Sequence, residues 1–299
     1  MKKTFLFIIT TFFFISCSQK EPQQLYSGEK LTVTDDIGRT VTLSKTPVRV
    51  ISFAPNVTEM IYALHAEDKL VGITAWCNYP PQTKEKEIVG DATTANLERI
   101  LALKPDLTVI VGTKNTPILA KLEALKIPVV VLNPVSIDDI FRDIKLLSVV
   151  LNKQAVADSL LIDIGTALRE IKSSLEVIPQ GKRPKVYAEI SSQPLMTAGN
   201  MGLVGLLIEQ AGGENIVSDI GQDYAVINPE IVIQRRPDIV LILHPQTDKK
   251  RLSERIGWQN IPAVKNKKVF DDLDLDIVLR AGPRSVMGLK ELNRIFYEK

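Results

Sequence analysis

Two kinds of apolar pattern alternate along most of the chain. Short runs of β-branched and other apolar residues predict buried strands, and apolar residues spaced three or four apart predict helices between them. The predicted strands are 48–53, 70–74, 107–111, 127–132, 184–190 and a last strand that begins at Val269. This alternation predicts an α/β fold with parallel, doubly wound sheets.

One unit of this alternation occurs twice. Residues 98–111 and residues 230–243 each predict a short helix, a Pro-Asp break and a buried strand. When the two copies are aligned, Glu98 meets Glu230. Two copies are too few for a solenoid, so the repeat predicts two similar lobes, each built around one copy.

The segment between the two copies, residues 137–178, has a helical period. A break near Asn152 divides it, and the second part carries apolar residues three or four apart as far as Leu175. This spacing predicts an amphipathic helix of about 25 residues, roughly 37 Å long. Because of its position between the copies, we expect this long helix to join the lobes. One more packing helix is the plainer interpretation and is compatible with that role.

Local signals place the turns and caps. Residues 31–43 predict a β-hairpin, because β-branched residues alternate on both sides of a polar turn. After the first strand of the first lobe, Asn56 and Glu59 have the spacing of a capping box at a helix start. Residues 197–202 predict a turn, and residues 279–284 predict the start of the terminal helix.

Composition and charge exclude several classes of function. The chain has 299 residues, 45% hydrophobic and 24% charged, which suits one large globular domain or two medium ones. Its net charge of +2 comes from Lys2 and Lys3, so the remainder shows no basic excess of the kind that binds nucleic acid. Two cysteines and two histidines are too few for a protein-built zinc site.

The N-terminus predicts export and a lipid anchor. Two lysines precede an apolar run, residues 5–15, that is too short to span a membrane. Residues 14–17 (Phe-Ile-Ser-Cys) then resemble a bacterial lipobox, in which the cysteine carries the lipid. We therefore expect residues 1–16 to be a lipoprotein signal peptide and Cys17 to be lipidated. The alternative is an ordinary signal peptide cleaved elsewhere. No later run is long and apolar enough to span a membrane.

These patterns divide the chain into consecutive parts. They are a signal peptide (1–16), a tether with the hairpin (17–46), an N-terminal α/β lobe (47–136), a helical linker with the long helix (137–178) and a C-terminal α/β lobe (179–299).

The order and spacing of several segments resemble the periplasmic binding proteins of the cobalamin and iron-siderophore class. The segments are Arg49–Glu59, Val71–Thr74, Cys77–Pro80, Asn96–Ile100, Leu103–Asp106, Gly212–Asn215 and Arg280–Arg284. The resemblance implies two lobes joined by a single long helix, with a cleft that closes little. It also implies a binding protein, not an enzyme, that acts as a monomer and delivers a small molecule to an ABC permease and its ATPase.

The resemblance assigns a role to the glutamate at the head of each repeat copy. It implies that Glu98 and Glu230, one on each lobe, dock onto the membrane-spanning permease. Both residues fall in the first turn of a predicted helix, at equivalent places on the two lobes. The alternative is that these acidic side chains only complement the helix dipole.

Candidate cargo contacts come from both lobes. We expect Trp76 from the first lobe to line the cleft with four residues of the second, Met196, Tyr224, Arg280 and Arg284. Aromatic faces suit a flat macrocycle or a catecholate ring, and the planar donors of arginine suit a carboxylate or an anionic chelate. A structural ion pair is an equal alternative for Arg284, and Met196 is more often a core residue.

The expected cargo is a metal chelate, with a corrinoid favoured over an iron-siderophore or haem. No cofactor and no metal site built by the protein are expected. Two other classes serve as alternatives. An enzyme or metal-cluster protein on a similar two-lobed fold would need cysteine ligands that Cys77 alone does not supply. A receptor for free manganese or zinc ions would need clustered ligands, and His65 and His244 lie far apart in the sequence.

Overall fold

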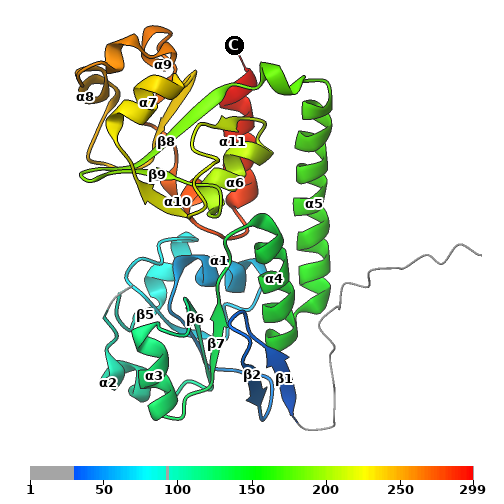
Figure 1. The fold of residues 1–299 in the computed structure, drawn as a ribbon. Helices are drawn as coiled ribbons and strands as arrows, with labels where there is room; N and C mark the ends of the chain where they lie inside the picture. Colours follow the sequence, from blue (N-terminus) through cyan, green and yellow to red (C-terminus); the bar gives the residue numbers. More distant parts are fainter. Residues whose placement is uncertain (1–29, 92–93, 299) are drawn as a thin grey trace, which may run out of the picture.

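Two lobes and a long helix beside them make up the part of the chain that the computed structural model describes, residues 30–91 and 94–298 (Figure 1). The helices α4 (Ile137–Leu151) and α5 (Gln154–Glu176) connect the lobes, and α5 runs along one side of both. The predicted α/β fold, with two lobes and one long connecting helix, is confirmed.

The sheet of the N-terminal lobe is parallel throughout, in the order β5-β4-β3-β6-β7. Its central strands are buried, as parallel strands covered on both faces should be. The strands are β3 (Val50–Ser52), β4 (Leu70–Ile73), β5 (Glu87–Ile88), β6 (Leu107–Val111) and β7 (Val129–Leu132). The helices are α1 (Pro55–Ala63), η1 (Pro81–Glu85), α2 (Leu97–Ala102) and α3 (Pro117–Ala124). The predicted hairpin is present as β1 (Leu31–Thr34) and β2 (Thr40–Leu43).

The sheet of the C-terminal lobe is mixed, in the order β11-β9-β8-β12-β13, with β10 also paired to β8. The strands β8, β10, β12 and β13 are parallel, whereas β9 and β11 run antiparallel. Their bounds are β8 (Lys185–Ser192), β9 (Leu195–Ala198), β10 (Glu214–Asn215), β11 (Tyr224–Val226), β12 (Ile239–Ile242) and β13 (Val269–Phe270). The helices are η2 (Gln180–Lys182), α6 (Leu203–Gln210), α7 (Pro229–Arg235), α8 (Lys249–Ser253), η3 (Trp258–Asn260), α9 (Pro262–Lys265), α10 (Leu275–Leu279) and α11 (Ser285–Tyr297).

The two repeat copies fold as equivalent units, α2–β6 and α7–β12. In each, the residue before the proline adopts a left-handed conformation, which ends the helix. The aspartate after the proline then binds the start of the neighbouring strand. Asp106 accepts a hydrogen bond from the backbone N–H of Arg49 at 2.8 Å, and Asp238 accepts one from Lys185 at 2.9 Å. The Pro-Asp break therefore joins each helix end to the first strand of its own lobe.

The linker has the predicted break and the predicted long helix. The hydroxyl of Ser136 accepts a hydrogen bond from the backbone N–H of Asp139 and caps α4. Asn152, in a left-handed conformation, ends it. The helix α5 has 23 residues and buries one face, which includes Leu161 and Ile171.

Apolar residues of both lobes belong to one continuous core. It includes Val50 and Met60 from the N-terminal lobe, Leu161 from α5, and Leu207 and Phe296 from the C-terminal lobe. A second core in each lobe lies apart from it, so each sheet packs apolar residues on both faces. The shared core makes α4 and α5 part of the packing of both lobes.

Three local predictions are wrong. Helix α1 begins with Ala54 as its N-cap and Pro55 at its first position, so Asn56 and Glu59 form no capping box. Residues 197 and 198 belong to strand β9, because they pair with β8 and β11. Residues 280–284 form a separate connection between α10 and α11, because their backbone folds into a turn closed by Ser285. Within residues 30–91 and 94–298, no helix has the length and apolar character needed to cross a bilayer.

Candidate functional site

The loop that follows β4, residues 74–80, carries the most exposed tryptophan of the described chain. Cys77 points inward, accepts a hydrogen bond from the buried hydroxyl of Thr58 at 3.1 Å, and shares a second hydrogen bond with the hydroxyl of Thr74 at 3.2 Å. Trp76 points outward and is 62% exposed, and Tyr79 is 43% exposed. Open α/β sheets bind ligands beyond the carboxyl ends of their strands, and this loop lies at such an end.

The connection between α10 and α11 meets helix α1 of the opposite lobe. Arg284 donates two hydrogen bonds to the carboxylate of Glu59, from Nε at 2.9 Å and from Nη2 at 2.7 Å. Arg280 donates a third to Glu59, from Nη1 at 3.2 Å. The Glu59 side chain is only 3% exposed, and its hydrogen bonds raise the pKa of Arg284 above its ordinary value. A buried carboxylate of one lobe is thus paired with two arginines of the other.

Further contacts join the same two segments. Asn78 accepts a hydrogen bond from Arg280 at 2.7 Å and donates one to Asp276 at 3.0 Å. The guanidinium of Arg284 stacks on the ring of Tyr79, 3.9 Å from its centre. Asn78 and Tyr79 belong to the loop that carries Trp76. Their contacts therefore fix this loop against the C-terminal lobe. We call these residues the inter-lobe cluster: Glu59, Asn78, Tyr79, Asp276, Arg280 and Arg284.

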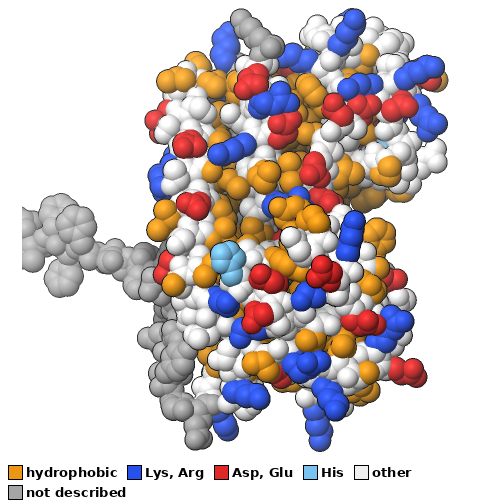
Figure 2. Space-filling model, turned by 180° about the vertical axis from the view of Figure 1, so that it is seen from behind, with side chains coloured by type: hydrophobic (Ala, Val, Ile, Leu, Met, Phe, Trp, Pro, Cys, Tyr) orange, Lys and Arg blue, Asp and Glu red, His pale blue; other side chains and the backbone are white. Residues whose placement is uncertain are grey.

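The remaining cargo candidates lie on two antiparallel strands. Tyr224 of β11 pairs with Ala198 of β9, and Val226 pairs with Met196, so Met196 and Tyr224 share one face of this pair of strands. Tyr224 is 40% exposed and Met196 is half-buried. Figure 1 shows β11, in yellow, at the edge of the upper lobe nearest the lower lobe. Seen from behind, the molecule is hollowed between the lobes at the edge opposite α5 (Figure 2).

Glu98 and Glu230 occupy equivalent helix positions on the two lobes. Each is the second residue of its helix, after a capping asparagine. The cap Asn96 accepts a hydrogen bond from the backbone N–H of Arg99 at 3.0 Å, and Asn228 accepts one from Glu230 at 2.9 Å. Both glutamates are exposed, and neither carboxylate makes a hydrogen bond or ion pair with any described residue. The helices α2 and α7 both lie on the side of the molecule away from α5 (Figure 1).

A further buried carboxylate, Glu189 in the middle of β8, was not foreseen. Arg255 donates two hydrogen bonds to it, at 2.6 and 2.8 Å, and His244 lies 2.9 Å from it. The Nδ1 of His244 accepts a hydrogen bond from the backbone of Gln246, so its Nε2 carries the proton that Glu189 accepts. His244 is buried in this cluster and is not presented to the cleft surface.

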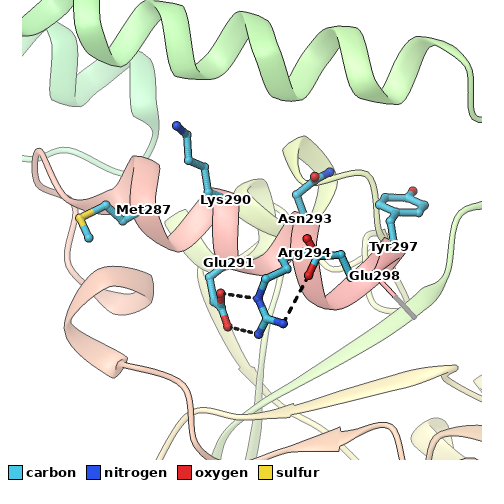
Figure 3. A pocket seen from close by; sticks show the side chains of 7 residues that line it. All are labelled: Met287, Lys290, Glu291, Asn293, Arg294, Tyr297 and Glu298. Atoms are coloured by element: carbon cyan, nitrogen blue, oxygen red, sulfur yellow. Dashed lines mark hydrogen bonds and ion pairs between the residues drawn. The ribbon is translucent and has the colours of Figure 1, made fainter.

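Two hollows of the described surface lie elsewhere. A shallow pocket of about 520 Å³ lies along α11 and is lined by side chains of that helix and by Glu298 (Figure 3). Its polar groups are already paired, because Arg294 binds Glu291 at 2.6 Å and reaches Glu298 at 3.6 Å. A second hollow, of about 590 Å³, lies among α4, α5, α6 and α11. No described group of three or more His, Cys, Asp or Glu residues is placed to hold a metal ion.

Two lobes, one long connecting helix and candidate ligand contacts on both lobes define a solute-binding protein of the two-lobed class. The chain belongs to the periplasmic binding protein family, whose model matches residues 50–274. It is 28% identical to an uncharacterized ABC transporter substrate-binding lipoprotein, YvrC, of Bacillus subtilis, over 89% of this chain and 85% of that one. It is 31% identical to a vitamin B12-binding protein of Pectobacterium carotovorum, over 82% of this chain and 87% of that one.

A solved structure agrees with this assignment. The periplasmic haem-binding protein RhuT from Roseiflexus superposes with a TM-score of 0.73 at 26% identity, over 84% of this chain and 98% of that one. The predicted family is confirmed, and so is the prediction that the chain is a binding protein and not an enzyme. Cys17 and the signal peptide lie outside the described residues.

The structure also locates residues that the sequence patterns misplaced. Asn56 donates a hydrogen bond to the backbone oxygen of Ala281 at 3.0 Å, and Glu59 binds the arginines of the same segment. Both had been assigned to a helix cap. Pro55 was the signal in the sequence that could have corrected this assignment. Proline favours the first position of a helix, so Ala54 is the N-cap, and the side chains of Asn56 and Glu59 are available for contacts outside the helix.

Proposed function

We propose that the protein is a lipid-anchored substrate-binding protein of an ABC importer. It holds a metal chelate between its lobes and delivers it, as a monomer, to a permease driven by an ATPase. The proposal rests on one observation, that both lobes carry the same two features. Exposed aromatic side chains stand on both lobes, Trp76 and Tyr224, and an unpaired glutamate stands at the same helix position of each lobe.

The cargo we favour is a corrinoid, with haem and iron-siderophores as alternatives. One relative that aligns with most of the chain is a vitamin B12-binding protein, and one solved structure with a similar fold is that of a haem-binding protein. Exposed aromatic faces such as Trp76 suit the flat ring system that both cargoes share. In this proposal Trp76, Met196, Tyr224, Arg280 and Arg284 border the cargo.

The anchor is proposed at Cys17, after removal of residues 1–16. A relative that aligns over most of the chain, YvrC, is a lipoprotein, which supports this assignment. The protein is then exported and held by lipid alone at the cell envelope, in the periplasm or at the outer face of the membrane, which leaves both lobes free to meet the permease.

The two glutamates are proposed to dock onto the permease. A two-lobed protein that presents one unpaired carboxylate on each lobe matches a permease of two similar halves with basic sockets. Reversing both charges, Glu98→Arg and Glu230→Arg, should abolish uptake of labelled cargo by cells that carry the importer. Cargo binding by the purified variant should be unchanged, since neither glutamate lies in the inter-lobe cluster.

A matched control separates docking from a general effect of charge. Asp163→Arg and Glu176→Arg place two charge reversals of the same kind on exposed positions of α5, on the opposite side of the molecule. This control should transport normally. Normal uptake by the Glu98 and Glu230 double variant would contradict the docking assignment.

A further inference from the structure

The two arginines best suited to an anionic cargo are both committed to carboxylates of the protein. Arg284 places Nε and Nη2 on Glu59, and Arg280 divides its donors among Glu59, Asn78 and Asp276. Their side chains are 14% and 17% exposed. Side-on bidentate contact with a carboxylate is the geometry by which arginine would hold a cargo carboxylate, and Glu59 already occupies it.

Exchanging Glu59 for a cargo carboxylate is strongly disfavoured. Glu59 is almost fully buried, and among the residues that the structure describes its carboxylate accepts hydrogen bonds from Arg280 and Arg284 alone. If these arginines turned to a cargo, a buried charge would be left without a partner. The arginines are also held in place, because Asn56 binds the backbone of Ala281 between them.

The net charge around Arg280 and Arg284 also disfavours an anionic cargo at this place. Three carboxylates, those of Glu59, Asp274 and Asp276, lie within 4.0 Å of the two guanidinium groups. The group as a whole therefore carries one excess negative charge. A further carboxylate brought to this place would meet repulsion instead of a free cation.

The exposed surface beside this group is aromatic. Trp76 is 62% exposed and Tyr79 is 43% exposed, whereas the amide of Asn78 on the same loop is bonded to Arg280 and Asp276. Such a surface stacks against a ring and offers no free cation to a cargo anion.

We propose that Glu59 determines the specificity of the cleft. By occupying the hydrogen-bond donors of Arg280 and Arg284, Glu59 prevents these arginines from binding an anionic group of the cargo. It thereby selects chelates whose periphery is neutral, such as the amide-edged corrinoids, over chelates that direct carboxylates to this place, such as haem and carboxylate siderophores. This inference rests on the proposed function.

The test compares three probes on the purified protein. Dissociation constants are measured for cyanocobalamin, haem and a ferric carboxylate siderophore by tryptophan fluorescence and by equilibrium dialysis. The wild-type protein should bind cyanocobalamin most tightly. Glu59→Gln keeps the shape of the side chain and releases the charge of the arginines. It should strengthen binding of the two anionic chelates by about tenfold to a hundredfold, as expected for one charge-assisted hydrogen bond, and leave cyanocobalamin nearly unchanged.

Two further variants show where the gain arises. Glu59→Gln combined with Arg284→Gln removes the released charge and should return the anionic chelates to wild-type affinity. Glu189→Gln, which breaks a buried carboxylate–arginine pair within the C-terminal lobe, should lower the melting temperature without changing the order of preference.

The outcomes separate this inference from the proposed function. An unchanged order of preference in Glu59→Gln, or a gain that persists in the double variant, would overturn the role of Glu59. Wild-type preference for an anionic chelate would overturn it too, even if Glu59→Gln fails to fold, and would leave the importer assignment intact. Binding of none of the three chelates would contradict the proposed function itself.

Discussion

Asp143 is a carboxyl group that the fold keeps protonated. Its side chain is fully buried in α4, one of its oxygens has no hydrogen-bond partner, and the nearest cation is Arg142, 3.4 Å away. Burial, and next the negative charge of Asp36, raise the pKa of Asp143 to about 9. The group therefore stays neutral where an exposed aspartate would be charged.

Asp143→Asn should stabilise the protein above pH 5. The unfolded carboxyl loses its proton near pH 4, but the folded one holds it until about pH 9. Unfolding thus releases a proton between these values, so stability falls as pH rises. Asparagine has no proton to lose, so the variant should gain about 1 kcal/mol or more at pH 7, and the gain should grow from pH 5 to pH 8. Urea unfolding at several pH values measures it.

Another aspartate of the same helix provides the control for this prediction. Asp138 lies on the same helix but is exposed, so Asp138→Asn should change stability by no more than about 0.5 kcal/mol, without a marked pH dependence. A destabilised Asp143→Asn protein at pH 8, or a gain independent of pH, would contradict the assignment.

Single residues show what patterns along the sequence resolve and what they miss. The exposed position of Trp76 agrees with its expected place in a loop beyond a strand. The partners of Arg280 and Arg284 were not foreseeable, because Glu59 lies more than two hundred residues away in the sequence. A spacing that fits a helix cap cannot reveal a contact made only when two lobes meet.

The long helix α5 contains an avoidable weakness, Gly165. This residue lies in the middle of α5, and an added Cβ would approach only the flexible end of Arg169, at 3.5 Å. Gly165→Ala should therefore raise the free energy of unfolding by about 0.5 to 1 kcal/mol, because alanine loses less backbone freedom on folding. Chemical denaturation measures the change.

A glycine in another helix serves as the matched control. In α6, a Cβ at Gly205 would overlap the backbone oxygen of Gly199, so Gly205→Ala should destabilise the protein. Equal effects of the two substitutions would contradict the prediction that the space around each glycine decides the sign of the change.

Elements with a clear period were predictable, and strands without one were not. The apolar spacing in residues 154–176 and the repeat predict α5 and both α/β units. The strands β9 (Leu-Met-Thr-Ala) and β11 (Tyr-Ala-Val) do not alternate apolar and polar residues, unlike the hairpin strands β1 and β2, which are similarly short. Their pairing with each other and with β8 depends on contacts across the sheet.

At the scale of the whole molecule, the lobes share one apolar core and a group of polar contacts. The largest apolar cluster includes residues of both lobes and of α4 and α5, and the inter-lobe cluster joins the lobes beside the loop of Trp76. An arrangement held at both places should close little when cargo binds. The family resemblance implies a cleft that closes little, and the shared core and the inter-lobe cluster supply a physical cause for it.

The account depends most on the claim that a metal chelate binds between the lobes. The two tryptophans make a direct test, because Trp76 is 62% exposed and Trp258 is 1% exposed. Titrating the purified protein with cyanocobalamin, haem and a ferric siderophore should give saturable quenching by at least one of them. The quenching should survive in Trp258→Phe and be largely lost in Trp76→Phe. No saturable quenching by any of the three chelates would contradict the claim.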